Sequence, residues 1–305
     1  GAYGDAKRLL LAVTQLPNQD QASELARYAQ TLLHLGQLAV KEAEYDKAQK
    51  LFEQSWNLAK SLKNDDLETT LLLHMGDLAR DTSEYDQAKA WYANGIVLAQ
   101  KSNDIAQFSR LHLHLGSMME QMGEYAIAEE SFREGLSLAR KYRLDELICE
   151  GMSKLGALSL KRGQMLNGLV EMTRALVLAR RIKHREVICT LLVAMSIGAM
   201  GLRRFNLAER WSSEALSIAR DLGYKRLITL ATVTRGNFES MQSRFAVAER
   251  YYDEALTLAN HIQHPYDLCF TLNCIGVHYF LKQDWASSTE YLQQSIMLSA
   301  KKQNT

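Results

Sequence analysis

The feature that most constrains the fold is a 40-residue period that runs along almost the whole chain. At one position of the period a small residue recurs, as Gly36, Gly76, Gly116, Gly156, Ser196, Gly236 and Gly276. At another a large one recurs, as Tyr45, Tyr85, Tyr125, Met165, Phe205, Phe245 and Trp285, and a second small one follows it, beginning with Ala48. Seven repeats run in register without insertion or deletion, which predicts units that each stack on the next.

Each repeat reads as two helices joined by a short polar turn. In the first repeat, Leu32, Leu35 and Ala39 follow the i, i+3, i+7 spacing of one helical face. We expect helices at roughly 21–42 and 45–61, and at the equivalent positions of every later repeat. The chain has only 2 prolines in 305 residues, which agrees with long uninterrupted helices.

We therefore predict an all-α fold: a right-handed α-solenoid of seven helix-turn-helix repeats preceded by an N-terminal half repeat. As domain organisation we expect one solenoid over residues 1–305. Its parts are a half repeat or capping helix at 1–20 and repeats at approximately 21–62, 63–102, 103–142, 143–182, 183–222, 223–262 and 263–305.

The small residues have a packing explanation. Where two helices cross, a glycine or alanine lets the backbones approach closely, and the large residue beside it fills the gap. A bulkier residue at the crossing would overpack it at a cost of about 1–3 kcal/mol.

The two ends of the chain differ from the repeats. Tyr3, Ala6, Leu10 and Val13 have the spacing of a second helix whose first helix is missing, and the chain stops soon after Leu298. Terminal repeats need a polar outer face. We interpret the chain as a fragment of a longer protein, with a natural capping helix at the N-terminus as the alternative.

Charge is balanced in total and polarised along the chain. The sequence holds 36 Lys+Arg and 35 Asp+Glu, a net charge of +1, which disfavours a uniformly basic nucleic-acid binder. Residues 1–150 hold 16 basic and 23 acidic residues, whereas residues 151–305 hold 20 and 12. This asymmetry fits a solvated edge, docking between copies or domains, or nucleic-acid binding; the last is disfavoured because the basic residues are not interleaved with exposed aromatics.

The segments that would indicate a membrane or secreted protein are missing from the sequence. No apolar run reaches the ~18 residues needed to span a bilayer, and the first residues do not form a signal peptide. Four cysteines in 305 residues do not form a disulfide framework. We expect a cytoplasmic protein with no membrane partner.

Catalytic and metal-binding motifs are missing from the sequence as well. It contains no phosphate loop, dinucleotide fingerprint, zinc-protease motif or nucleophile elbow, so we expect no enzyme activity and no cofactor. His34, His74 and His114 recur at the 40-residue spacing and form a column. They could share a metal, but neighbouring helix axes lie ~8–10 Å apart and no fourth ligand is evident, which favours histidines packed at repeat junctions.

Three cysteines also share one repeat position. Cys149, Cys189 and Cys269 belong to different repeats, and disulfides need Cα separations of roughly 4.4–6.8 Å. We interpret them as buried structural thiols.

The first helices should line an inner, concave wall whose character changes along the chain. In repeats one to three this wall is polar and charged, whereas in repeats four to six it is apolar apart from one asparagine. A contiguous exposed apolar patch usually marks a binding site, although closer packing of the long helices would bury the same residues as core. The candidate partner-binding residues are Arg110, Ala157, Leu160, Val193, Ile197, Met200, Asn237, Met241, Phe270, Asn273, Val277 and Phe280.

The repeat resembles a known family. Leu35-Gly36 followed by Tyr45, then Ala48-x-x-x-Phe52, is similar to the tetratricopeptide repeat pattern. The resemblance covers about residue 22 to the end. The period is 40 rather than 34, the tyrosine expected three residues after the glycine is Ala39 in the first repeat, and the closing proline is absent.

The resemblance implies a non-catalytic module that binds a protein or peptide in the groove, with other domains of the same polypeptide as further possible partners. The long regular repeats look like those of bacterial signal-transduction ATPases, maltose-regulator-like transcription activators and quorum-sensing peptide receptors. The alternative implied is therefore a ligand- or protein-sensing regulatory domain.

Overall fold

The computed structural model describes residues 22–42, 44–262 and 265–301, and in these ranges it contains fourteen helices and no strand. The predicted half repeat at 1–20 lies outside the described residues. The chain divides into two compact units, residues 1–147 and 148–305, and each is considered by itself. No helix within the described ranges is both long enough and apolar enough to cross a membrane.

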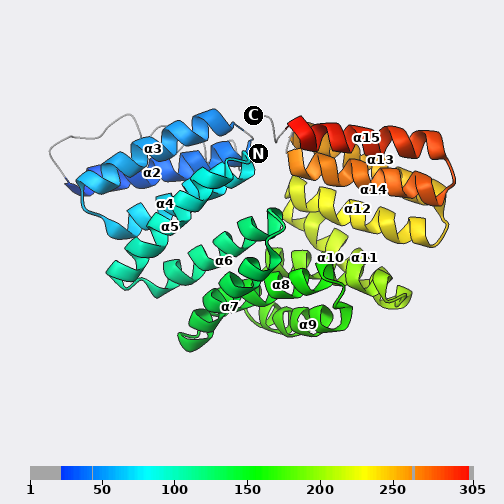
Figure 1. The fold of residues 1–305 in the computed structure, drawn as a ribbon, viewed down its shortest axis with the longest axis horizontal. Coiled ribbons are helices and arrows are strands. Elements are labelled where there is room, and N and C mark those ends of the chain that lie inside the picture. The colour runs from blue at the N-terminus through cyan, green and yellow to red at the C-terminus, as the bar shows by residue number, and fades with distance from the viewer. Residues whose placement is uncertain (1–21, 43, 263–264, 302–305) are drawn as a thin grey trace. The chain divides into compact units, whose positions relative to one another are not determined.

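The helices follow one another as pairs, each joined by a short turn (Figure 1). Unit one contains α2 (Ala22–Lys41), α3 (Tyr45–Ser61), α4 (Asp65–Asp81), α5 (Tyr85–Ser102), α6 (Ile105–Gln121) and α7 (Tyr125–Lys141). The boundary between the units falls inside α8 (Asp145–Lys161). Unit two continues with α9 (Met165–Arg181), α10 (Arg185–Gly201), α11 (Phe205–Leu222), α12 (Lys225–Met241), α13 (Phe245–Ile262), α14 (Pro265–Leu281) and α15 (Trp285–Lys301).

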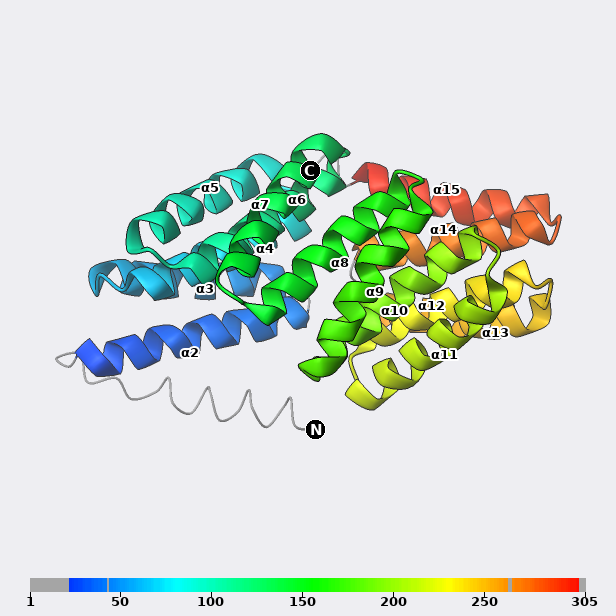
Figure 2. The same cartoon turned by 90° about the horizontal axis from the view of Figure 1, so that it is seen from below.

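Within each unit the first helices of successive repeats lie next to one another. In unit one α4 packs against α2 and α6, and in unit two α12 packs against α10 and α14. The second helices, such as α11 and α13, pack on the first helix of their own repeat and on that of the next. Figure 2 shows the helix pairs from a second direction. The all-α array of stacked helix pairs predicted from the repeat period is thus confirmed.

The recurring glycine lies where the two helices of a repeat touch. A Cβ built on Gly36 would lie 2.4 Å from the ring of Phe52, and one on Gly116 would lie 2.6 Å from the ring of Phe132. Both rings are buried and cannot move aside freely. The same close approach, always to the residue 16 positions later, occurs at Gly76, Gly156, Gly236 and Gly276. The packing explanation for the repeat is therefore correct.

Repeat five shows how the crossing tolerates a change. Ser196 stands where the other repeats have glycine, and the residue 16 positions later is the small Ser212 rather than a large side chain. Both serines are buried, and the Ser196 hydroxyl donates to the carbonyl oxygen of Ala208 at 2.9 Å. Compared with the other repeats, the side chain at position 196 is larger and the one at position 212 is smaller, so the total volume at the crossing changes little.

The first helices after α2 begin later than the sequence predicted. The predicted range of 21–42 fits α2, but α4 and α6 begin at Asp65 and Ile105, several positions further along the repeat. Asn64 and Asp104 set these starts, because their side chains accept the backbone N–H of the third residue beyond at 3.1 and 3.0 Å.

Every turn that the structure describes in full contains one residue with a left-handed backbone. Among the described residues, eleven have φ between +53° and +82°. Three are glycines, at Gly123, Gly163 and Gly223; the other eight are Lys63, Ser83, Asn103, Arg143, Lys183, Arg203, Ser243 and Gln283. The regular turn fixes the register between consecutive helices, even where the residue is not the glycine that this conformation prefers.

Candidate functional site

The first helices present one face that their own second helices do not cover. We call this face of α2, α4 and α6 the unit-one wall and that of α10, α12 and α14 the unit-two wall. Positions 37 and 41 of the first repeat, and their equivalents in the later repeats, lie one helical turn apart on this face. The two walls have the same backbone pattern and different side chains.

Apolar side chains are exposed along the unit-two wall, with exposed fractions from 40% to 55%. We call this set the apolar stripe; it consists of Ile197, Met241, Val277, Phe280 and Leu281. Trp285, at the start of α15, is also exposed and meets the Phe280 ring edge-on at 5.2 Å between centroids. The stripe therefore crosses all three helices of the unit-two wall and widens at α14.

The structure divides the apolar residues that the sequence assigned to this wall. Ile197, Met241, Val277 and Phe280 are exposed, as a binding surface requires. Val193 and Met200 are only 3% and 4% exposed and belong to the core. Met200 packs in one cluster with Ala208 and Phe238. The core alternative therefore holds for Val193 and Met200, and the binding surface stays a prediction for the four exposed residues.

The remaining apolar candidates are half-buried. Leu160 fills the space above two glycines, since a Cβ on Gly168 or Gly198 would lie within 3.0 Å of its side chain. Ala157, on the same helix, is partly covered, and Phe270 packs against the core cluster of α13 and α14. Leu160 and Phe270 therefore contribute mainly to packing.

Two asparagines bring polar groups to the unit-two wall. Asn273 is exposed on α14. The Asn237 amide is held in place, because its oxygen accepts the Tyr252 hydroxyl at 2.8 Å and its nitrogen donates to the Cys274 sulfur at 3.6 Å. Burial raises the pKa of the Cys274 thiol to about 11, so the thiol is protonated.

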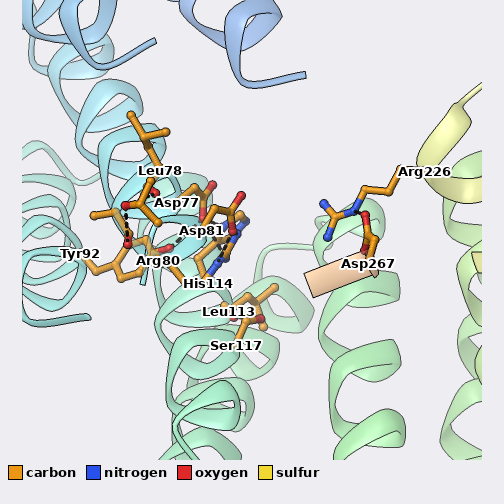
Figure 3. Close-up of polar contacts among 12 residues, drawn as sticks. Asp77, Leu78, Arg80, Asp81, Tyr92, Leu113, His114, Ser117, Arg226 and Asp267 are labelled. Atoms are coloured by element: carbon orange, nitrogen blue, oxygen red, sulfur yellow. Dashed lines mark hydrogen bonds and ion pairs between the residues drawn. The ribbon is translucent and has the colours of Figure 1, made fainter. Parts of the chain in front are cut away.

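The unit-one wall has a partly buried carboxylate, Asp77, at the position equivalent to Asn237 (Figure 3). One oxygen of Asp77 accepts the Tyr92 hydroxyl at 2.7 Å and His114 Nδ1 at 2.7 Å, and Arg80 lies 2.9 Å from the same oxygen. Burial alone would raise the pKa of Asp77, but the charges of His114 and Arg80 outweigh it and hold that pKa far below its usual range. The carboxylate therefore ties together α4, α5 and α6.

The histidine column continues this network toward α2. The Gln37 amide nitrogen lies 2.8 Å from His74 Nε2, and its oxygen lies 3.2 Å from His34 Nδ1. The His74 ring stacks on Phe52 at 5.9 Å between centroids, and burial lowers the pKa of His74 to about 4. The structure places these histidines at the junctions between repeats. Across the described part of the chain no three His, Cys, Asp or Glu side chains are grouped so that they could hold a metal ion.

Arg110 lies on α6 in unit one and is half-buried. Its charge is one of those that help to lower the pKa of His74. It belongs to the polar unit-one wall, and the other predicted site residues belong to unit two.

The cysteines donate to backbone carbonyls of the neighbouring second helix. Cys149 Sγ lies 3.7 Å from the Ala175 oxygen, and Cys189 Sγ lies 3.4 Å from the Ala215 oxygen. Both are free thiols, and burial raises the pKa of Cys189 to about 11. They occupy the position at which Ser109 donates to the Gly135 carbonyl in repeat three.

A further polar cluster in unit two was not predicted. Glu239 on α12 is buried, and it pairs with Arg235 on the same helix and with Arg244 in the following turn, at 3.0 Å for the latter. The charges of Arg235 and Arg244 compensate the charge of the buried Glu239 carboxylate. No motif marks the cluster, since the pairing depends on the turn that follows α12.

A model of the tetratricopeptide repeat matches residues 109–142, from Ser109 on α6 to the end of α7. The match spans most of one repeat and includes the glycine crossing at Gly116. No curated protein matches the chain. The recurring helix pairs are therefore tetratricopeptide-like, with a longer period.

Several solved structures share the fold. A Rap protein in complex with the competence and sporulation factor is 9% identical, with a TM-score of 0.80 over 97% of this chain and 80% of that one. The Rap conjugation gene regulator of plasmid pLS20, in complex with the Phr* peptide, is 15% identical, with a TM-score of 0.76 over 95% and 80%. The apo quorum sensor NprR from B. thuringiensis is 14% identical, with a TM-score of 0.68 over 97% and 82%. At these identities the likeness establishes a shared fold.

Proposed function

We propose that this chain, an array of tetratricopeptide-like repeats, is a non-catalytic module that binds a peptide or a protein segment on the unit-two wall. The observation that carries the proposal is the apolar stripe, which leaves five large side chains in water on one face of three adjacent helices. Contiguous exposed apolar surface of this kind usually marks an interaction site.

The fold supports the same use. Two of the similar structures are complexes, one with the competence and sporulation factor and one with the Phr* peptide. A third is a quorum sensor, which favours a second form of the proposal, a peptide-sensing regulatory domain of a larger protein. Both forms of the proposal use the same surface. In the first, binding holds the partner; in the second, binding of the peptide regulates the larger protein.

The stripe supplies part of the binding free energy. Covering the exposed half of a Met or Phe side chain contributes about 1 kcal/mol, so five residues contribute on the order of 5 kcal/mol. Association itself costs about 4–15 kcal/mol, so polar contacts must add to the apolar ones. The exposed amide of Asn273 can donate to and accept from a peptide backbone, which gives the site one such contact.

The test is a selection of binding peptides from a random library, with the purified chain as bait. The variant Ile197→Asp with Met241→Asp should lose the selected peptides while its helicity and melting stay close to wild type, because both side chains are exposed. Met200→Asp serves as the contrasting control and should destabilise the protein, because Met200 is buried. If the wild type selects no peptide that the double variant loses, the unit-two wall is not the binding site.

A further inference from the structure

We infer that the segment bound on the unit-two wall is acidic, with carboxylates placed beside its apolar residues. This inference rests on the proposed function. It is carried by the charges around the apolar stripe, which differ from those at the same repeat positions in unit one.

The first helices and the turns that follow them have opposite charge in the two units. Residues 25–44, 65–84 and 105–124 contain 4 basic and 10 acidic residues. Residues 185–204, 225–244 and 265–284 contain 8 basic and 4 acidic residues. Equivalent segments of one repeat array therefore carry −6 and +4, and the positive set belongs to the wall that exposes the stripe.

Basic residues follow the exposed apolar ones at the end of each first helix. Arg203 and Arg204 lie in the turn after α10, the helix that carries Ile197. Arg244 lies in the turn after α12, and Lys282 directly follows the end of α14. Each of the three first helices is thus followed by at least one basic residue, and Asp284 is the one acid in these three turns.

These basic residues are not equally available. Arg244 pairs with Glu239 at 3.0 Å, and Lys282 pairs with Glu249 at 2.7 Å. The side chains of Arg203 and Arg204 are exposed, and within the described residues they form no ion pair or side-chain hydrogen bond. In that part of the chain these two guanidinium groups are therefore free cations in the turn after α10, the helix that carries Ile197.

The position of Arg204 gives a second reason to expect an anion. Arg204 is the residue that precedes α11, where the helix dipole presents its positive end. The equivalent residues of unit one are Glu44, Glu84 and Glu124, whose charge suits a helix N-terminus. An arginine there opposes the dipole, and a carboxylate bound beside it would relieve the repulsion and pair with both arginines.

The helix spacing sets the pattern of the bound segment. Neighbouring helix axes lie about 8–10 Å apart, and a polyproline II segment advances about 3.1 Å per residue with about three residues per turn. About three residues of such a segment therefore span from one first helix to the next, and every third side chain faces the same way. An apolar residue at every third position would meet α10, α12 and α14 in turn, and the positions between them would be left for acidic residues.

The experiment uses the full chain and three fluorescein-labelled peptides of the pattern Leu-x-x-Leu-x-x-Leu, in which x is Glu, Gln or Lys. Fluorescence anisotropy should give the tightest binding for the Glu peptide, and its Kd should rise with salt concentration because exposed charge pairs are screened. The Gln peptide should bind about tenfold more weakly, and the Lys peptide more weakly still. The variant Arg203→Glu with Arg204→Glu should reverse the order of the Glu and Lys peptides, and circular dichroism should show that it remains folded.

The outcomes separate the two proposals. If the Glu and Gln peptides bind equally and charge reversal changes neither, the acidic preference is wrong and the peptide-binding function stands. If Met241→Asp leaves all peptide binding unchanged, the proposed site itself is wrong. Binding of a single-stranded oligothymidylate that Arg203→Glu with Arg204→Glu abolishes would overturn the inference in favour of nucleic acid. A dimer dissolved by the same variant in sedimentation would assign the surface to a second copy of the chain and overturn it as well.

Discussion

Substituting Gly116 by alanine tests the helix crossing on which the array is built. The added Cβ would lie 2.6 Å from two ring carbons of Phe132, well inside ordinary contact, and the ring is fully buried. Overpacking of this kind costs about 1–3 kcal/mol, whereas alanine gains about 1 kcal/mol over glycine inside a helix. We expect Gly116→Ala to lower the free energy of unfolding by up to about 2 kcal/mol.

The same substitution should lose its cost once the ring is removed. Phe132→Ala alone should cost about 3–5 kcal/mol, because it empties a buried ring site. In that background Gly116→Ala meets no ring, although its Cβ would still lie 3.1 Å from the Ala128 carbonyl oxygen. The substitution should therefore be neutral or stabilise by up to about 1 kcal/mol through helix propensity. The double-mutant cycle therefore predicts a coupling of about 1–3 kcal/mol between the two positions.

The assay is urea unfolding followed by far-ultraviolet circular dichroism. Hydrogen exchange of α6 and α7 should accompany it, because stacked repeats need not unfold in one step. An equal effect of Gly116→Ala with and without the ring would refute the reasoning, since the steric contact would then contribute nothing.

Three further predictions concern turns, buried charge and pH. Lys63 has φ +53°, a backbone conformation that glycine adopts more easily, so Lys63→Gly should stabilise the protein by about 0.5–1 kcal/mol. For the same reason Gly223→Ala, at φ +69°, should destabilise it by a similar amount, and thermal melting measures both changes. Glu239→Ala should destabilise unit two by about 2 kcal/mol, because it removes the closer carboxylate of the largely buried Arg235 and leaves Glu209 at 3.5 Å; an unchanged urea midpoint would contradict this. The pKa of His74 is about 4 in the folded state and about 6.5 when unfolded, so the unfolded chain binds the extra proton between these values. The contribution of His74 to the free energy of unfolding should therefore be complete above pH 6.5 and fall on the order of 3 kcal/mol as the pH approaches 4. In His74→Gln the difference between the free energies of unfolding measured at pH 7.5 and at pH 5 should be smaller.

The repeat period was enough to predict the helix pairs and the glycine crossings. Helical spacing alone misjudged the wall, because Val193, Ile197 and Met200 share one face by the i, i+4, i+7 rule and yet only Ile197 is exposed. The repeat position would have corrected Val193, since its equivalents Leu73 and Leu113 are buried and apolar as well.

Met200 could not have been assigned in the same way. Its equivalents Arg80 and Glu120 are charged, so the position has no common character across the repeats. Its burial depends on local packing with Phe238, which the sequence pattern does not report.

The hydrogen bonds of Asp77 could not be predicted from the sequence either. Its partners lie 15 and 37 positions away, at Tyr92 and His114, and neither distance is a helical repeat. The same two offsets join Asn237 to Tyr252 and to Cys274, so the offsets follow from the stagger between stacked repeats. Only the packed structure supplies that stagger.

The serine pair of repeat five limits how this protein can be recombined. Ser196 and Ser212 fit each other at the helix crossing. In the other repeats a glycine faces a large side chain at this crossing, so neither serine would fit there. A chimera that transplants α10 without α11 would bring a side chain against a bulky neighbour, whereas the reverse transplant would leave a void. The segment that can be exchanged in this array is therefore the complete helix pair. In relatives that arose by duplication or recombination of repeats, we expect the boundaries of the exchanged segments to lie in the links between helix pairs and not in the turns within them.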